Sequence, residues 1–202
     1  MSAVHAVIIA GGEGQRLGGV RKADLRIGGI RQIDRVVAAL GAMTAPILVS
    51  TGPAGNRIGM PAGCVAVADL DMACAGPLAG LAAAIERLRQ DGVNTGLLVS
   101  VAVDTPFLPT DFVMRMLAGL ADAPAAFTAW GDDFYPPNAI WRIEHLQGLA
   151  PSLAGDAAPR SLKALQQLLG ACRVDWSASA ANPFVNVNTV ADLVALQRIA
   201  RS

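Results

Sequence analysis

The sequence predicts an α/β protein with a doubly wound, mainly parallel sheet and an added antiparallel portion toward the C-terminus. Apolar runs of strand length alternate with segments of helical periodicity over the first 120 residues, a pattern typical of such sheets. The most apolar run, Gly96–Val103, is expected at the centre of the sheet, covered on both faces. Glycine-rich and acidic residues follow the strand-like runs, where ligands bind in this fold class.

The expected elements follow one another in a regular order. Strands are expected at Val4–Ala10, Pro46–Ser50, Cys64–Ala68, Gly96–Val103, Ala125–Trp130, Asn138–Trp141 and Cys172–Asp175. Helices are expected at Gln32–Ala42, Pro77–Gln90, from Thr110 as N-cap to Leu120, at Ser161–Leu169, and after Thr189, with Asp192 in capping-box position. Residues Gly131–Pro137 are expected to form the loop between two strands. We interpret the 202 residues as one domain.

Composition excludes several function classes. The formal net charge is zero, which argues against nucleic-acid binding through a basic surface. No apolar run reaches the roughly 18–20 residues that cross a bilayer, and no signal sequence is recognised, so we expect a cytoplasmic protein that does not enter the membrane. The three cysteines, Cys64, Cys74 and Cys172, lack metal-ligand spacing and are interpreted as reduced thiols.

The segment Val7–Lys22 carries the strongest functional signal. An apolar strand ends in five glycines within nine residues, with Arg16 among them and Lys22 after them. Glycines let backbone N–H groups approach phosphate oxygens, and the cations neutralise their charge. The segment fits neither the dinucleotide-binding nor the P-loop fingerprint, because Leu17 and Ala23 stand where those patterns need glycine and a hydroxyl residue. We interpret it as a polyphosphate loop rather than an ordinary tight turn.

Asp104 follows the most apolar strand and precedes Thr105-Pro106. A carboxylate there faces the ligand crevice and suits Mg²⁺, which binds one or two carboxylates together with phosphate oxygens and water. Capping of the turn before Pro106 is the alternative, and the two roles are compatible.

Two further segments offer polar groups at the expected ligand edge. Asp69 and Asp71 precede Gly76–Gly80, whose small residues would let a ligand approach the N-terminus of a helix; close helix–sheet packing at Gly80 is the alternative. Asn186 and Asn188 alternate with apolar residues, so in a strand they would share one face and could hold metal, water or phosphate. Asn188 could instead only turn the chain into the last helix.

Four motifs together resemble the MobA family of molybdenum cofactor guanylyltransferases, within the nucleotide-diphospho-sugar transferase-like superfamily. They are IAGGEGQRLGGxxK at Ile9–Lys22, GPLAG at Gly76–Gly80, DTPFLP at Asp104–Pro109 and FVNVNT at Phe184–Thr189. The resemblance covers essentially the whole chain. It implies a Rossmann-like nucleotidyltransferase that joins GMP from GTP to a molybdopterin-type cofactor and releases pyrophosphate.

The resemblance also implies site residues. It places nucleotide contacts at Ile9, Ala10, Gly11, Gly12, Gly52 and Asp69, catalytic roles at Arg16, Lys22 and Asp104, Mg²⁺ on Asp104, and Asn186 and Asn188 near the reacting phosphates. Residues up to about 120 would bind the nucleotide, and about 121–202 the cofactor. The cofactor pocket is expected around Gly131–Asn138, including Tyr135, Pro137 and Asn138, and around Ser161–Lys163. Transient contacts with other cofactor-assembly or acceptor proteins are expected.

The chain departs from the family pattern at two positions. Arg21 stands where the family usually has aspartate before the lysine, and Gly52 where it often has asparagine. Arg21 could add a phosphate contact, change the substrate or accompany lost activity. A transferase that uses CTP or a sugar phosphate, and a non-catalytic nucleotide-binding partner in cofactor assembly, therefore stay open as alternatives.

Overall fold

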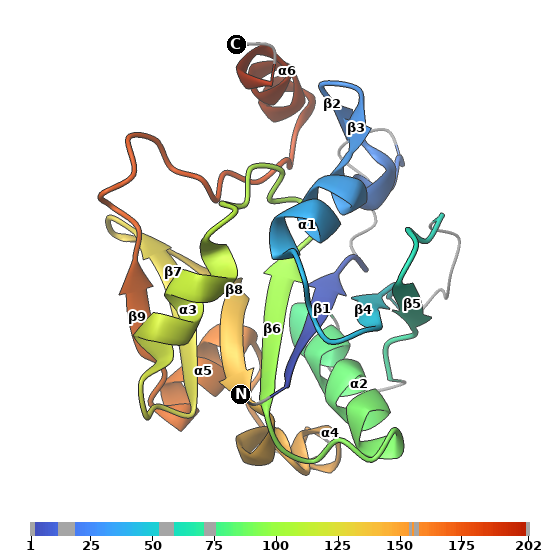
Figure 1. The fold of residues 1–202 in the computed structure, drawn as a ribbon, viewed down its shortest axis with the longest axis vertical. Helices are drawn as coiled ribbons and strands as arrows, with labels where there is room; N and C mark the ends of the chain where they lie inside the picture. The colour runs from blue at the N-terminus through green and yellow to red at the C-terminus, as the bar shows by residue number, and fades with distance from the viewer. Residues whose placement is uncertain are drawn as a thin grey trace.

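A computed structural model describes residues 3–11, 19–52, 59–70, 76–153, 155 and 158–200. Its main sheet has seven strands in the order β5-β4-β1-β6-β8-β7-β9 (Figure 1). The pairs β1–β4, β1–β6, β4–β5 and β7–β9 are parallel, and β8 runs antiparallel to both of its neighbours. This confirms the expected mainly parallel sheet with an antiparallel portion in the later part of the chain.

The strands are β1 (Val4–Ile9), β4 (Ile47–Ser50), β5 (Cys64–Val67), β6 (Leu97–Ala102), β7 (Ala125–Trp130), β8 (Asp133–Arg142) and β9 (Cys172–Asp175), with a separate hairpin of β2 (Arg26–Ile27) and β3 (Ile30–Arg31). The α-helices are α1 (Gln32–Leu40), α2 (Pro77–Gln90), α3 (Phe112–Leu120), α4 (Leu149–Ser152), α5 (Leu162–Leu169) and α6 (Val190–Ile199). Short 3₁₀ helices lie at Lys22–Asp24 and Ile143–Leu146. No helix within the described ranges is long and apolar enough to span a membrane.

Helices cover both faces of the sheet, as the doubly wound prediction requires. One apolar cluster packs α1 and α3 against one face, and a second packs α2, α4 and α5 against the other. Alternate residues of β1 enter the two clusters, with Ile8 in the first and Val7 in the second. All six residues of β6 are buried, which confirms its central position.

The β1–β6 boundary is the topological switch point of the sheet. After β1 the chain moves to β4 on one side, and after β6 it moves to the β8–β7–β9 side. In open α/β sheets the crevice at such a point, beyond the carboxyl ends of the strands, is where ligands bind. The residues that follow β1 and β6 are those of the glycine segment and Asp104.

The structure corrects two predictions in the second half of the chain. Most of the expected loop Gly131–Pro137 belongs to β8, which begins at Asp133 and pairs with β7 through a register shift between Phe127 and Thr128. Pro136 and Pro137 lack amide donors, and both fall within that irregular stretch, where β8 has no paired residue in β7. The β7–β8 ladder therefore loses no hydrogen bond to the prolines. Cross-strand pairing with β7 overrides the local turn signal.

The N-terminus of α3 is also different from the prediction. Asp111, not Thr110, is the N-cap, and no side chain caps the helix. The chain approaches α3 through a turn in which the Phe112 amide donates to the carbonyl of Pro109 at 3.0 Å, so the backbone satisfies this helix end without Thr110. By contrast, the Ser161 cap of α5 and the Thr189–Asp192 capping box of α6 are both present.

Candidate functional site

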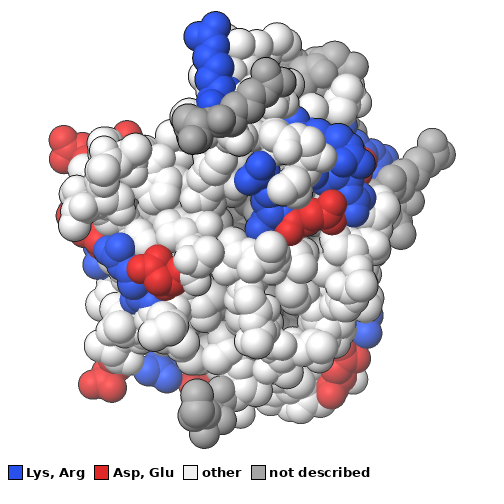
Figure 2. Space-filling model, turned by 45° about the horizontal axis from the view of Figure 1, so that its top comes forward, with Lys and Arg blue, Asp and Glu red and all other residues white. Residues whose placement is uncertain are grey.

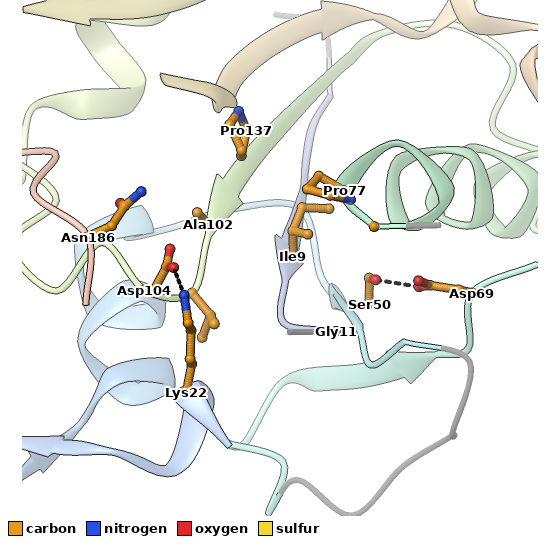
Figure 3. Close-up of a pocket in the computed structure, with 12 residues that line it drawn as sticks. Ile9, Gly11, Lys22, Ser50, Asp69, Pro77, Ala102, Asp104, Pro137 and Asn186 are labelled. Atoms are coloured by element: carbon orange, nitrogen blue, oxygen red, sulfur yellow. Dashed lines mark hydrogen bonds and ion pairs between the residues drawn. The ribbon is translucent and has the colours of Figure 1, made fainter. Parts of the chain in front are cut away.

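A cavity of about 340 Å³ lies at the carboxyl ends of the central parallel strands (Figure 3). The last residue of β4 and residues that follow β1, β5 and β6 meet here, together with the N-terminus of α2 and part of the segment before α6. The lining residues are Ile9, Gly11, Lys22, Ser50, Asp69, Gly76, Pro77, Ala102, Val103, Asp104, Pro137 and Asn186.

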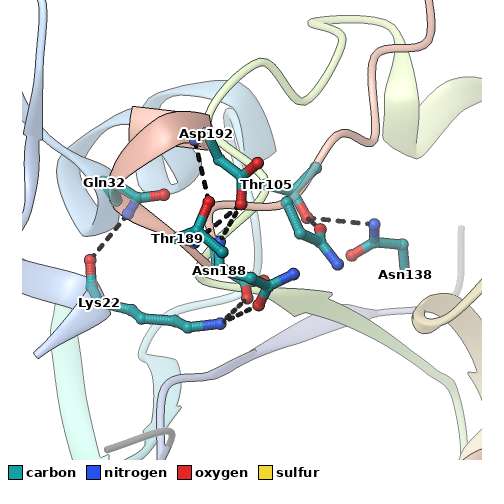
Figure 4. Close-up of polar contacts among 9 residues, drawn as sticks. Lys22, Gln32, Thr105, Asn138, Asn188, Thr189 and Asp192 are labelled. Atoms are coloured by element: carbon teal, nitrogen blue, oxygen red, sulfur yellow. Dashed lines mark hydrogen bonds and ion pairs between the residues drawn. The ribbon is translucent and has the colours of Figure 1, made fainter. Parts of the chain in front are cut away.

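Lys22 and Asp104 form an ion pair at one end of the cavity. Lys22 Nζ lies 2.6 Å from Asp104 Oδ2 and donates a second hydrogen bond to Asn188 Oδ1 at 2.7 Å. The two charged side chains are only 18% and 15% exposed. The pair joins segments 82 residues apart, and the Asn188 contact adds a third segment (Figures 3 and 4).

Gln32 fixes the backbone that carries Lys22. Its side-chain Nε2 donates to the Lys22 carbonyl at 3.0 Å, and its backbone N–H donates to the Leu25 carbonyl at 2.9 Å. Gln32 is fully buried at the start of α1, so it ties the 3₁₀ turn of Lys22 to the rigid part of the fold (Figure 4). No sequence pattern singled it out, because glutamine at a helix start is ordinary.

The capping box of α6 holds Asn188 in place. Asp192 Oδ2 accepts the backbone N–H groups of Asn188 and Thr189 at 3.0 and 2.8 Å, while Thr189 Oγ1 accepts from the Asp192 amide at 3.1 Å (Figure 4). The bonds from the Asn188 backbone and from Thr189, aided by Lys22, lower the pKa of Asp192. Asn188 therefore both turns the chain into α6 and contacts Lys22.

Asn186 and Asn188 do not lie on one face of a strand, as the alternation predicted. The segment is irregular, with one backbone bond from Val187 N–H to the Asp104 carbonyl at 3.2 Å. Asn186 lines the cavity and accepts a hydrogen bond from Thr105 Oγ1 at 3.4 Å. This segment contacts the chain just beyond the carboxyl end of β6 and is not part of a strand.

Asn138 is an interior residue rather than a pocket residue. Its Oδ1 accepts the Ala102 amide at 2.9 Å and its Nδ2 donates to Thr105 Oγ1 at 3.3 Å, with 1% of the residue exposed. The side chain thus replaces a ladder bond where β8 leaves β6. Of the other two residues expected near the cofactor, Pro137 lines the cavity, whereas the Tyr135 hydroxyl accepts from Asn182 Nδ2 at 2.5 Å.

Ser50 and Asp69 form the opposite end of the cavity. Ser50 Oγ donates to Asp69 Oδ1 at 2.6 Å (Figure 3). Between the two ends, Gly11 and Gly52 pack backbone against backbone: a Cβ on Gly11 would lie 2.9 Å from Gly52 Cα, and Gly52 has a φ of +78°. A Cβ on Gly52 would lie 3.0 Å from the Gly11 carbonyl oxygen, and the positive φ of Gly52 is unfavourable for most side chains, so glycine suits this position.

The structure brings most of the predicted site residues together. Six of them line the cavity: Ile9, Gly11, Lys22, Asp69, Asp104 and Asn186. Asn188 accepts a hydrogen bond from one of these, Lys22. Ala10 is buried and donates its amide to Ser50, and Gly52 lies behind Gly11, so neither lines it. Gly12, Arg16, Asp71 and Cys74 lie outside the described residues. Ser50 was missed, because a serine at the end of an apolar run looks like an ordinary strand residue.

Basic side chains also gather on the side of the molecule that carries α1 and the β2–β3 hairpin. Figure 2 shows Lys and Arg clustered beside acidic atoms on the upper right, the side on which α1 and the β2–β3 hairpin lie in Figure 1. Arg31, the last residue of β3 and the N-cap of α1, pairs with Asp34 at 2.7 Å and with Asp24 at 3.7 Å, so part of this positive charge is neutralised locally. Much of the rest of this face is uncharged.

The model of the MobA-like NTP transferase domain matches residues 6–172. The chain belongs to this family. It is 32% identical over 198 residues to a molybdenum cofactor guanylyltransferase of Nitrobacter hamburgensis, covering 97% of this chain and 94% of the relative. It is 34% identical to one of Acidiphilium cryptum, covering 97% and 95%.

Solved structures share the fold. The molybdopterin-guanine dinucleotide biosynthesis protein A of Archaeoglobus fulgidus superposes with a TM-score of 0.70 at 18% identity, covering 98% of each chain. The 4-diphosphocytidyl-2C-methyl-D-erythritol synthase of Anaerococcus prevotii superposes with a TM-score of 0.74 at 12% identity, covering 100% of this chain and 97% of that one. At these identities the likeness concerns the fold alone.

Proposed function

We propose that the protein transfers GMP from GTP to a molybdopterin-type cofactor, forming the guanine dinucleotide and pyrophosphate. Family membership and the names of the relatives support the reaction class and its substrates. The observation that carries the proposal to this chain is the shielded pair of Lys22 and Asp104 in the switch-point cavity, where a cation and a carboxylate can serve a polyphosphate and its metal.

The cavity has two chemically different ends. Lys22 and Asp104 lie beyond β1 and β6, whereas Asp69 follows β5, three strand spacings or about 14 Å from β6. A nucleotide lying across the strand ends would place its triphosphate at the Lys22 end and its base at the Asp69 end. Asp69 would repel phosphates, so the reverse orientation is disfavoured.

In the reaction, a phosphate oxygen of the acceptor attacks the α-phosphorus of GTP in line. A new P–O bond forms, the bond to the bridging oxygen breaks, and pyrophosphate leaves with the electron pair. The acceptor phosphate is already an anion, so no protein nucleophile is needed, and the described cavity lining contains no cysteine or histidine. Catalysis then consists of positioning and charge stabilisation.

The residues present fit a magnesium ion. Mg²⁺ binds one or two carboxylates with phosphates and water, and Asp104 with the amide oxygens of Asn186 and Asn188 offers oxygen donors of this kind. When bound, the ion would neutralise charge on the transferring phosphoryl group. Within the described residues no group of three or more His, Cys, Asp or Glu could hold a metal ion. The phosphates of the nucleotide would supply further ligands to a magnesium ion.

Lys22 would exchange partners during binding. In the free protein its ammonium is neutralised by Asp104 and Asn188. With nucleotide present, Lys22 would turn to the phosphates and stabilise the leaving pyrophosphate, which frees Asp104. Arg21 precedes it in the chain and is partly exposed, so its guanidinium would add a phosphate contact.

The reaction would take place in the cytoplasm, with transient contacts to cofactor-assembly or acceptor proteins, as expected from the sequence.

Nucleotide transfer by Asp104→Ala and Lys22→Ala tests the proposal. Loss of one transition-state charge contact costs roughly 10²–10³ in rate, so turnover by both variants should fall by that amount. Arg89→Ala is the control, because Arg89 pairs with Glu86 on the exposed far part of α2. Near-wild-type turnover of both site variants would overturn the proposal.

A further inference from the structure

Ser50 is held rigidly beside Asp69. It is the last residue of β4, is 1% exposed, and its carbonyl accepts the Ala10 amide at 2.9 Å. In the sheet it lies opposite Ile9 and Val67. Its hydroxyl donates to Asp69 Oδ1 at 2.6 Å, a short bond to a carboxylate oxygen (Figure 3).

Helix α2 closes over this hydroxyl at Gly80. A Cβ on Gly80 would lie 2.4 Å from Ser50 Oγ and 2.9 Å from Ser50 Cβ. The glycine therefore lets the helix pack onto Ser50 without displacing its hydroxyl. This contact gives the last glycine of the GPLAG motif a packing role, one of the two alternatives that the sequence left open.

The second oxygen of Asp69 lies near Gly11. Asp69 Oδ2 lies 3.6 Å from the point that a Cβ on Gly11 would occupy, and both residues line the cavity. Among the described residues, no Lys, Arg or His lies within ion-pairing distance of Asp69. A carboxylate is an acceptor only, so the group that meets this oxygen must be a donor.

We propose that Ser50 is a positioning residue that orients Asp69 to accept donors from the edge of a guanine base. This inference rests on the proposed function, because it assumes that GTP is the nucleotide. Guanine presents two adjacent donors, the N1–H and the 2-amino group, whereas hypoxanthine presents only N1–H. The Ser50 hydroxyl occupies one lone pair of Oδ1 and fixes the plane of the carboxylate. Oδ2 and the remaining lone pair of Oδ1 can then accept both adjacent donors of guanine, whereas hypoxanthine would fill only one of these positions.

The affinities of Ser50→Ala for GTP, ITP and 2′-deoxy-GTP test this role by calorimetry. Loss of one positioning hydrogen bond should weaken GTP binding about 3- to 10-fold and bring the GTP-to-ITP affinity ratio toward one. Asp69→Ala should abolish the preference, and Ser50→Ala should have no further effect in that background. Thr51→Val is the matched control, since Thr51 Oγ1 donates to the Val67 carbonyl at 3.4 Å rather than to Asp69.

Three results would overturn the role of Ser50. They are an unchanged GTP-to-ITP ratio in Ser50→Ala, additive effects of the two substitutions, and a preference confined to the 2′-hydroxyl, which would move Asp69 from the base to the ribose. No GTP binding by the wild-type protein would overturn the proposed function and this role together. Where the wild-type protein binds GTP, each of these three results would overturn this role alone.

Discussion

Replacing Lys22 with methionine removes the ammonium group and keeps an unbranched side chain of similar length. The wild-type ammonium makes two hydrogen bonds, at 2.6 Å to Asp104 and 2.7 Å to Asn188. The variant leaves the Asp104 carboxylate in place without this cation. It also removes the hydrogen bond from Lys22 to Asn188, which links the turn after the glycine segment to the turn before α6. We therefore expect Lys22→Met to destabilise the free protein as well as to impair nucleotide transfer.

The magnitude follows from the burial of the pair. Hydrogen bonds to charged groups contribute about 1.5–3 kcal/mol, and exposed ion pairs about 0–1 kcal/mol. Lys22 and Asp104 are 18% and 15% exposed, which places the pair between these limits. We expect a loss of roughly 1–2 kcal/mol, or about 2–8 °C in Tm for a domain of this size.

Thermal and urea unfolding without nucleotide measure this loss. Arg87→Met is the control, because Arg87 pairs with Asp91 at 2.9 Å but these side chains are 37% and 42% exposed. The control should change the free energy of unfolding by less than about 0.5 kcal/mol. If Lys22→Met matched the control, the inference that this pair stabilises the free site would be refuted.

Three further predictions concern packing and pH. Gly80→Ala should lower the free energy of unfolding in urea, because overpacking against Ser50 costs about 1–3 kcal/mol against a helix-propensity gain of at most about 1 kcal/mol; a more stable variant would contradict the packing argument. Backbone and side-chain bonds from Asn188 and Thr189 lower the pKa of Asp192, so this carboxylate stabilises the fold above the ordinary aspartate pKa and the contribution is lost as pH falls through the lowered value. Asp192→Ala should therefore lose less stability than the wild type on acidification. If the free energies of unfolding in urea of the two proteins fell in parallel with decreasing pH, this role of Asp192 would be excluded. Burial lowers the pKa of His5, so the unfolded chain takes up the proton first and stability falls with pH below the ordinary histidine pKa. His5→Leu should flatten the stability profile between about pH 7 and about pH 5, and an unchanged slope would count against it.

Local sequence signals predicted the first half of the fold well. The bounds of α2 match the prediction because proline at its first position and charged residues at its end mark both termini. β8 was predicted too short because Gly131 and two prolines are strong turn signals. Pairing with β7 and the irregular register that accommodates the prolines are properties of two strands together, which one segment does not encode.

The candidate site was predictable where position along a strand determines position in space. Asp104 and Asp69 follow parallel strands, so the topology alone brings them to one edge of the sheet. The partners of these residues were not predictable. Lys22 meets Asn188 across 166 residues, and the Ser50 hydroxyl that bonds Asp69 lies under α2, where only the absence of a side chain at Gly80 leaves room for it. Such contacts depend on side-chain packing between elements that are distant in the sequence.

The most direct test of the central claim is pyrophosphate release with each nucleoside triphosphate in the presence and absence of molybdopterin. We predict release with GTP that requires molybdopterin, accompanied by an equal amount of the guanine dinucleotide product. Release with CTP but not GTP, or GTP binding without any pyrophosphate release in the presence of molybdopterin and Mg²⁺, would contradict guanylyl transfer by this protein.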